Sequence, residues 1–237
     1  MSKNSPIGAS CSMRNYGVVI PAFNASGTIG ETLRSVAAQT VRPALVIVVD
    51  DGSTDDLGSA TGGTDLPVRL LRQANAGPGS ATTRGFAALS TPLIATLDAD
   101  DLWLPDKIER QLAHLEKYPA TAGVFCHWRN FRNDRPDAPE AETVAGWSRT
   151  TMMIRREVAE TVGPIVDPPG GRGEMIDWIA RAREAGLALD MLDEALALRR
   201  IRPGSLSYGR DAARDRGYLE VARLAMLRRA RNKAGPG

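Results

Sequence analysis

The sequence is poor in cysteine and has no long apolar run. Two cysteines, Cys11 and Cys126, are too few for a disulfide framework or a cysteine-based zinc site. No stretch approaches the roughly 18 consecutive apolar residues of a membrane-spanning helix. Residues 1–14 are polar, lack the apolar centre of a secretory signal and predict a disordered leader. These absences favour a cytoplasmic protein.

Charge is unevenly distributed along a chain of otherwise ordinary globular composition. From Arg199 onward eleven Lys/Arg face three Asp/Glu, a net charge of +8 in this segment, which leaves −6 on residues 1–198. Such a basic segment suits anionic lipid, nucleic acid or an acidic protein, or forms only a solvated helix. We expect peripheral contact with anionic lipid on the inner face of the membrane, and no nucleic-acid partner.

Apolar, β-branched runs alternate with helical segments along the chain. The expected strands are Tyr16–Pro21, Ala44–Val49, Val68–Leu71, Leu93–Leu97, Gly123–Trp128 and Trp147–Arg155. The expected helices are Thr28–Gln39, Ala81–Ala88, Pro105–Lys117, Arg156–Val162, Glu174–Ala185 and Asp211–Lys233. This alternation predicts an α/β fold in which helices cover both faces of a mostly parallel sheet.

Acidic clusters follow two of the expected strands directly. Asp50 and Asp51 end one strand, and Asp98-Ala99-Asp100-Asp101 follows another. Ligands of such sheets bind beyond the carboxyl ends of the strands, and clustered carboxylates there suit Mg²⁺ or Mn²⁺ bound to a diphosphate. The alternative is that Asp101 or Asp106 only caps the helix that begins near Pro105.

Four motifs in order resemble the family-two inverting glycosyltransferases. They are Val18-Val19-Ile20-Pro21-Ala22-Phe23-Asn24, Val48-Val49-Asp50-Asp51-Gly52-Ser53-Thr54-Asp55, Asn75-Ala76-Gly77 and Asp98-Ala99-Asp100-Asp101. The resemblance implies a glycosyltransferase A-type fold, a nucleotide-binding three-layer α/β/α sandwich with a mixed, mostly parallel sheet. It covers residues 15–205, with a nucleotide-sugar half at 15–120 and an acceptor half at 121–205. Residues 206–237 would form a basic helical extension.

The resemblance implies a metal-dependent transfer of a sugar from a nucleotide-sugar donor, typically UDP-linked, to a hydroxyl acceptor. Asp51 would hydrogen-bond the base. Asp98 and Asp100, with Asp101 as a further ligand, would hold Mn²⁺ or Mg²⁺. The expected nucleotide-sugar-binding residues are Pro21, Ala22, Phe23, Asn24, Asp51, Asn75, Gly77, Asp98, Ala99, Asp100 and Arg202.

The sequence departs from the family pattern in three places, at Thr82/Thr83, Met175 and Arg202. An inverting transfer needs a base for the acceptor hydroxyl, but the usual Asp of Glu174–Arg181 is replaced by Met175. Glu174 or Asp177 would substitute, and we favour Glu174. Arg202 stands where the family often has a metal-ligating histidine. Because guanidinium has no lone pair to offer, Arg202 would pair with the diphosphate or remain a surface residue.

Two rival functions remain open, and the departures favour the first of them. One is a catalytically impaired relative that binds a nucleotide sugar or a partner protein without transfer. The other is a nucleotidyltransferase, which shares strand-end acids and a metal. The chain lacks the glycine- and lysine-rich opening that such enzymes usually show. We therefore favour glycosyl transfer.

Overall fold

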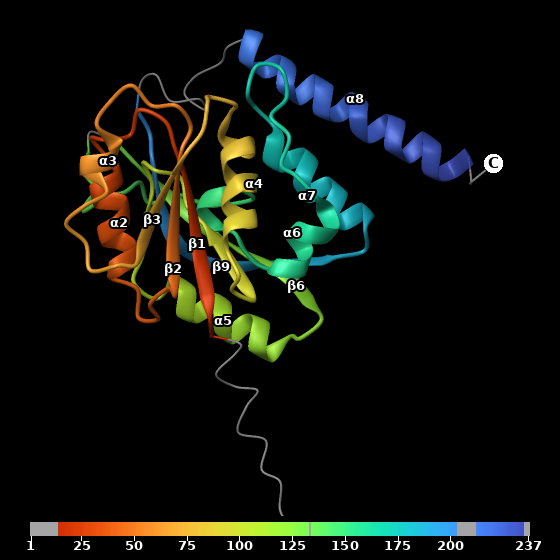
Figure 1. Ribbon diagram of the computed structural model, residues 1–237. Coiled ribbons are helices and arrows are strands. Elements are labelled where there is room, and N and C mark those ends of the chain that lie inside the picture. The colour runs from red at the N-terminus through yellow and green to blue at the C-terminus, as the bar shows by residue number, and fades with distance from the viewer. Residues whose placement is uncertain (1–13, 133, 203–211, 235–237) are drawn as a thin grey trace, which may run out of the picture.

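The computed structural model describes residues 14–132, 134–202 and 212–234 (Figure 1). The expected leader lies outside these residues apart from Arg14, and so does the expected boundary between residues 205 and 206. The elements in chain order are β1 (Tyr16–Ala22), α2 (Ile29–Ala37), β2 (Leu45–Asp50), α3 (Leu57–Ala60), β3 (Val68–Arg72), α4 (Pro78–Ala88), β4 (Leu93–Thr96), β5 (Leu102–Trp103), α5 (Lys107–Lys117), β6 (Thr121–Phe131), β7 (Thr143–Ala145), the 3-10 helix η1 (Arg149–Thr151), β8 (Met153–Arg155), α6 (Arg156–Val162), α7 (Glu174–Glu184), β9 (Ala188–Arg200) and α8 (Ala212–Ala234).

One mixed sheet organises the chain, with strand order β3-β2-β1-β4-β8-β6-β9-β5 and β7 paired to β6. Strands β1 to β4 are parallel, β8 is antiparallel to both β4 and β6, and β6 is parallel to β9. Strands β1, β2, β4, β6 and β9 therefore end at the same edge. The loops that follow β2 and β4 flank the end of β1, because β1 lies between these two strands.

Alternating side chains of the strands feed two apolar cores, as a two-residue period requires. Val18 and Ile20 of β1 pack with α2 and α5 on one face of the sheet, whereas Val19 packs with α4, α6 and α7 on the other. Figure 1 shows α2 and α4 on opposite sides of the strands. The fold is thus the expected three-layer α/β/α arrangement.

Strands β1 to β4 lie close to where the sequence predicts them, whereas β5, β7 and β9 were not expected and β8 is shorter than expected. Trp147–Arg155 was expected as one strand, and only Met153–Arg155 is extended, after the short helix η1. Ala188–Arg200 forms a 13-residue strand that the sequence did not reveal. Its first half carries Asp190 and Asp193, which interrupt the apolar run, and its pairing with β6 contains register shifts.

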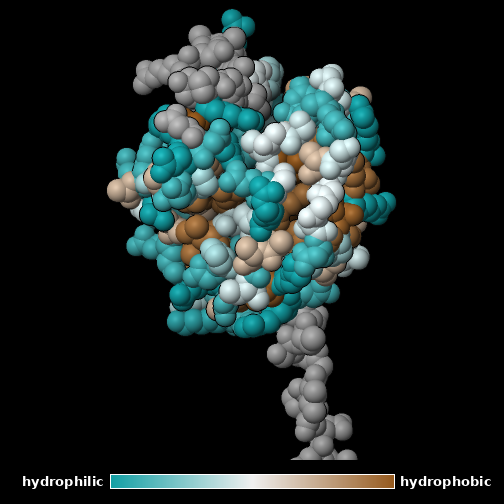
Figure 2. All heavy atoms as spheres, turned by 90° about the vertical axis from the view of Figure 1, so that its left-hand side faces the viewer, coloured by the Kyte–Doolittle hydropathy of each residue, from teal (hydrophilic) through white to brown (hydrophobic). Residues whose placement is uncertain are grey.

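The long carboxy-terminal helix α8 packs along α7 (Figure 1). No helix among the described residues is long and apolar enough to cross a bilayer. On the face of the molecule that Figure 2 shows, apolar side chains are visible between hydrophilic ones.

Candidate active site at the carboxyl edge of the sheet

The loop Asp98–Asp101 turns sharply after β4. The backbone N–H of Asp101 donates to the carbonyl oxygen of Asp98 at 3.1 Å. Helix α2 holds this loop from behind, because the hydroxyls of Thr28 and Thr32 donate to the carbonyl oxygen of Ala99 at 2.9 and 3.0 Å. With the backbone of Ala99 turned to α2, Asp98 and Asp100 remain partly exposed, at 29% and 25% of their side chains.

The surroundings of Asp100 include the charge of Asp98. Burial raises the pKa of Asp100, and the charge of Asp98 raises it further, against the opposing effect of Arg202 and Arg200. Arg202 Nη2 lies 3.6 Å from Asp100 Oδ2. The charge of Asp98 beside Asp100 is a repulsion that a bound divalent cation would relieve.

Asp101 is buried, at 4% exposure, and two hydrogen bonds hold its carboxylate. Its Oδ2 accepts from Thr150 Oγ1 at 2.5 Å and its Oδ1 accepts from the backbone N–H of Arg200 at 2.8 Å. Burial and the charges of Asp100 and Asp98 raise the pKa of Asp101 well above its usual range. Asp101 therefore joins the loop to η1 and to the end of β9, and its expected role as a metal ligand stays a prediction.

Arg149 connects Asp98 to Glu174, a contact that sequence reasoning missed. Arg149 Nε donates to Asp98 Oδ1 at 2.8 Å, and its Nη1 donates to Glu174 Oε1 at 2.6 Å. Burial opposes the charge of this guanidinium, but the two carboxylates outweigh it and raise the pKa of Arg149. A single arginine within an expected strand carries no motif, so only the tertiary structure reveals this connection.

The two candidate bases have different surroundings. Glu174 is the first residue of α7 and lies beside Asp98 across Arg149. Asp177 is 6% exposed and is bound by Arg181 at 2.8 Å and by Arg228 of α8 at 2.8 Å. Met175, which replaces the usual Asp, is 6% exposed within the apolar core. Of these three residues, Glu174 is the one linked to Asp98, through the guanidinium of Arg149.

Asp51 holds the Asn75-Ala76-Gly77 loop. Its carboxylate accepts from Gln73 Nε2 at 2.7 Å and from the backbone N–H groups of Ala76 and Gly77, both at 2.9 Å. A carboxylate offers about four lone-pair positions, so these three donors leave room for one more. The structure thus brings Asp51, Asn75 and Gly77 together as the sequence predicts, and base recognition by Asp51 stays a prediction.

The loop after β1 carries the other expected donor-binding residues. Pro21 and Ala22 are buried in β1, and the carbonyl oxygen of Ala22 accepts from Asp51 N–H at 2.8 Å. Phe23 is 51% exposed. Asn24 has a φ of 49°, which asparagine tolerates, and its Oδ1 accepts from Thr54 N–H at 2.9 Å. These contacts fix the loop beside Asp51.

Asp167 is another residue near the site that the sequence did not reveal. Its carboxylate accepts from the backbone N–H groups of Gly79 and Ser80, at 2.9 and 2.8 Å, in the first turn of α4. A Cβ on Gly77 would lie 2.6 Å from Asp167 Cγ, so any side chain at position 77 would displace the Asp167 carboxylate. The Asp-Pro dipeptide at 167–168 signals a turn, but it does not identify the helix that the aspartate caps.

The described residues contain no group of three or more His, Cys, Asp or Glu side chains arranged to hold a metal ion. Mg²⁺ is usually held by one or two carboxylates together with substrate phosphates. Asp98 and Asp100 supply two such carboxylates on one loop, and both are partly exposed. The residues present therefore fit a divalent ion that completes its coordination shell with a diphosphate.

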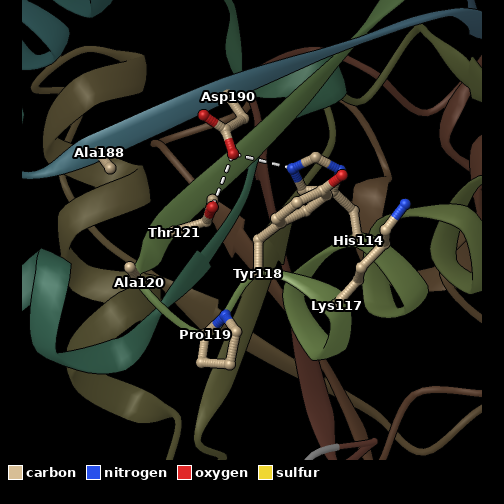
Figure 3. Close-up of a pocket in the computed structure, with 8 residues that line it drawn as sticks. All are labelled: His114, Lys117, Tyr118, Pro119, Ala120, Thr121, Ala188 and Asp190. Atoms are coloured by element: carbon tan, nitrogen blue, oxygen red, sulfur yellow. Dashed lines mark hydrogen bonds and ion pairs between the residues drawn. The ribbon is translucent and has the colours of Figure 1, made fainter.

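A separate hollow lies at the opposite edge of the sheet, where β6 and β9 begin. It measures about 420 Å³, and His114, Tyr118, Thr121 and Asp190 are among its lining residues (Figure 3). Asp190 Oδ2 lies 2.8 Å from His114 Nε2 and accepts from Thr121 Oγ1 at 2.6 Å. This group ties α5 to β9, and it shares no residue with the Asp98 cluster.

Solved structures share the fold. The S. aureus TarS 1–349 structure in complex with UDP-GlcNAc aligns with a TM-score of 0.73 at 20% identity, over 90% of this chain and 66% of that one. The mannosyltransferase PcManGT from Pyrobaculum calidifontis, in complex with GDP-Man and Mn²⁺, aligns with a TM-score of 0.64 at 16% identity, over 94% and 76%. These similarities confirm the expected α/β fold.

Sequence relatives cover part of the chain. An uncharacterized glycosyltransferase of Rickettsia felis is 33% identical over 130 residues, which are 49% of this chain and 22% of that protein. The succinoglycan biosynthesis protein ExoW of Rhizobium meliloti is 27% identical over 157 residues, or 60% and 48% of the two chains. The chain thus spans less than half the length of these two curated relatives.

The family model described as Glycosyl transferase family 2 matches residues 17–168. This range contains the first-loop, Asp50-Asp51, Asn75-Ala76-Gly77 and Asp98–Asp101 motifs, together with Arg149 and Asp167. Glu174 lies beyond its end. Because the match covers more than half of the sequence and the fold agrees with it, the chain belongs to glycosyl transferase family 2.

Proposed function

We propose that this protein transfers a sugar, with inversion, from a UDP-linked donor to a hydroxyl acceptor with the help of Mn²⁺ or Mg²⁺. The observation that carries the proposal is the position of Glu174. Its carboxylate shares the Arg149 guanidinium with Asp98, within the strand-end cluster of family motifs. In this proposal Glu174 is the base, and this contact is what supports a position beside the expected donor site. The TarS complex with UDP-GlcNAc and the PcManGT complex with Mn²⁺ support the donor and metal classes.

In this proposal the side chains divide the reaction between them. Asp98 and Asp100 would hold the metal and the donor, Asp51 would accept a hydrogen bond from the nucleobase of the donor, and Arg202 would pair with the diphosphate. Glu174 removes the acceptor proton as the acceptor oxygen bonds to the anomeric carbon and the bond from that carbon to the phosphate oxygen breaks. When bound, the divalent ion would neutralise charge that develops on the departing nucleoside diphosphate.

The first test is turnover of a panel of UDP-sugars and GDP-mannose with Mn²⁺ or Mg²⁺, measured as release of the nucleoside diphosphate. Glu174→Gln and Asp100→Ala should each lower the rate by about 100-fold or more, as loss of a base or of charge stabilisation commonly does. Asp193→Asn is a matched control, because this carboxylate is 99% exposed on β9. Wild-type rates in Asp100→Ala would contradict the proposal.

A binding function without transfer is the second candidate, because Met175 occupies the usual base position and is buried. The two candidates predict different results with the same protein. Both predict that UDP with Mn²⁺ raises the melting temperature, since a ligand of the folded state stabilises it. Only the enzyme releases UDP from a UDP-sugar. Stabilisation without turnover across the panel would favour the binding protein.

Peripheral membrane contact through α8 is a further part of the proposal. Leu219 and Met226 are 73% and 71% exposed, and their spacing of two helical turns places them on one face of α8. The charge of +8 from Arg199 onward would attract anionic headgroups. Flotation with phosphatidylglycerol vesicles at low salt should recover the protein, and phosphatidylcholine vesicles should not. Equal recovery with both lipids, or none, would contradict this attachment.

A further inference from the structure

Arg149 is held rigidly by the same strand that presents Asp98. Its carbonyl oxygen accepts from Thr96 Oγ1 at 2.7 Å and from the backbone N–H of Met152 at 3.2 Å. Its side chain is 9% exposed. Thr96 ends β4, two residues before Asp98, so the backbone of Arg149 and the Asp98 loop share one anchor. The position of the Arg149 guanidinium is therefore coupled to that of the loop Asp98–Asp101.

The guanidinium fork gives its two carboxylates a defined separation. Nε donates to Asp98 at 2.8 Å and Nη1 donates to Glu174 at 2.6 Å. Guanidinium is planar and permanently charged, so two nitrogens of one rigid group fix both partners. A lysine ammonium is a point charge on a flexible stem and cannot impose this geometry.

Two other arginines near the loop Asp98–Asp101, Arg200 and Arg202, bind different groups. Arg200 donates from Nε to the backbone carbonyl of Asp100 at 2.8 Å and contacts Glu31 and Asp134 through its remaining nitrogens. Arg202 lies 3.6 Å from the Asp100 carboxylate. Neither contact reaches α7. The ion pair with Arg149 connects Glu174 to Asp98 and so to the loop that is expected to bind the donor.

We infer that Arg149 is a positioning residue that sets Glu174 against the donor held at Asp98. The inference rests on the proposed function and adds to it the group that determines where the base lies. Without Arg149 the carboxylates of Asp98 and Glu174 would repel each other, and the first turn of α7 would lose its tie to β4. The base would then stand away from the acceptor oxygen, while the donor loop would keep its bonds to α2 and β9.

The inference predicts a specific kinetic pattern. Arg149→Met should lower kcat by about 100-fold, since small displacements of a catalytic group have effects of this size. The KM for the donor should change less. Arg149→Lys should recover only part of the rate, because it restores the charge but not the fork. UDP with Mn²⁺ should still raise the melting temperature of both variants.

A double-mutant cycle separates positioning from an independent role. Glu174→Gln removes the base but keeps an oxygen that accepts from Arg149, so this variant should fold normally. If Arg149 acts through Glu174, the double variant Arg149→Met/Glu174→Gln should be no slower than Glu174→Gln alone, within about 3-fold. Arg155→Met is a matched control, since Arg155 is an arginine tied to backbone carbonyls at the far edge of the sheet.

The outcomes distinguish this inference from the proposed function. Turnover by the wild-type protein together with near-normal kcat in Arg149→Met would overturn the positioning role alone. Losses that multiply in the double variant would do the same. If Arg149→Met does not fold, Arg149→Lys carries the test, and a full wild-type rate in that variant would contradict the role of the fork. No wild-type turnover with any donor would overturn the proposed function and, with it, the inference.

Discussion

A Cβ on Gly217 of α8 would lie 2.0 Å from the carbonyl oxygen of Arg172, in the loop that leads to α7. A contact this short involves backbone and cannot be relieved by a side-chain rotation. Arg172 also bonds Asp215 of α8 at 2.7 Å. Helix α8 thus presses on the loop that ends one residue before Glu174, although it lies outside the stretch that the family model matches.

Gly217→Ala should therefore destabilise the protein by about 1–3 kcal/mol, as overpacking commonly does. The reason is that α8 or the loop at Arg172 must move to admit the methyl group. Urea denaturation measures the change. Gly58→Ala is the control, because a Cβ at this other helical glycine has no neighbour closer than 3.9 Å. Equal stability of Gly217→Ala and wild type would show that α8 does not pack against this loop in solution.

Asp51→Asn should loosen the loop at Asn75–Gly77. An asparagine has one oxygen acceptor and an NH₂ group, so it cannot accept from all the donors that Asp51 now satisfies. A buried N–H without an acceptor costs about 1–3 kcal/mol. Chemical denaturation should show this loss, and the stabilisation by UDP with Mn²⁺ should shrink. Undiminished stabilisation by UDP would contradict base recognition by Asp51.

Asp100→Asn and Asp101→Asn should differ, although the two residues are adjacent. In Asp101→Asn the new amide could still accept from Arg200 N–H and exchange a hydrogen bond with Thr150, so this variant should keep Mn²⁺-dependent UDP binding. Asp100→Asn should weaken that binding by about tenfold or more, because a partly exposed carboxylate beside the expected metal is lost. Calorimetric titration with UDP and Mn²⁺ checks both. Equal losses would return Asp101 to the set of metal ligands that the sequence predicts.

Lys107 should make the free energy of unfolding depend on pH in the alkaline range. Its side chain is fully buried, donates to Gln111 Oε1 at 2.7 Å and lies 4.2 Å from the centre of the Trp103 ring. Burial lowers the pKa of Lys107 from 10.5 to about 8. Between these values Lys107 binds its proton more fully in the unfolded chain than in the folded one, so the contribution of Lys107 to stability should rise with pH across this window.

The matched variant for this prediction is Lys107→Met, which should lack this rise. The free energy of unfolding of wild type minus that of the variant should increase by on the order of 2–3 kcal/mol from pH 8 to pH 10.5. Burial raises the pKa of the neighbouring Cys126 thiol from 9.0 to about 11, so the contribution of this group to stability falls as the pH rises above 9. Because both proteins contain Cys126, this effect is common to them, and the difference reports Lys107. Denaturation at several pH values measures the difference, and parallel curves for both proteins would refute the prediction.

Local patterns revealed much of the amino-terminal half. Continuous apolar runs such as Leu93–Thr96 predict buried strands because each strand is covered on both faces, and the acids that follow mark the strand ends. The 13-residue strand Ala188–Arg200 escaped detection because its pairing with β6 is irregular and its acidic residues lie at an edge of the sheet. Its place in the sheet depends on a partner far away in the sequence.

The sequence by itself determined the class of fold, the family motifs and the candidate acids, because periodicity and short spacings are local properties. The tertiary structure alone decided the distant partners of these acids: it turned Asp101 inward, paired Asp177 with Arg228, and joined Glu174 to Asp98 through Arg149. Arg149 lies 51 residues from Asp98 and 25 from Glu174. Contacts over such separations arise only when strands and helices pack, and no local pattern encodes them.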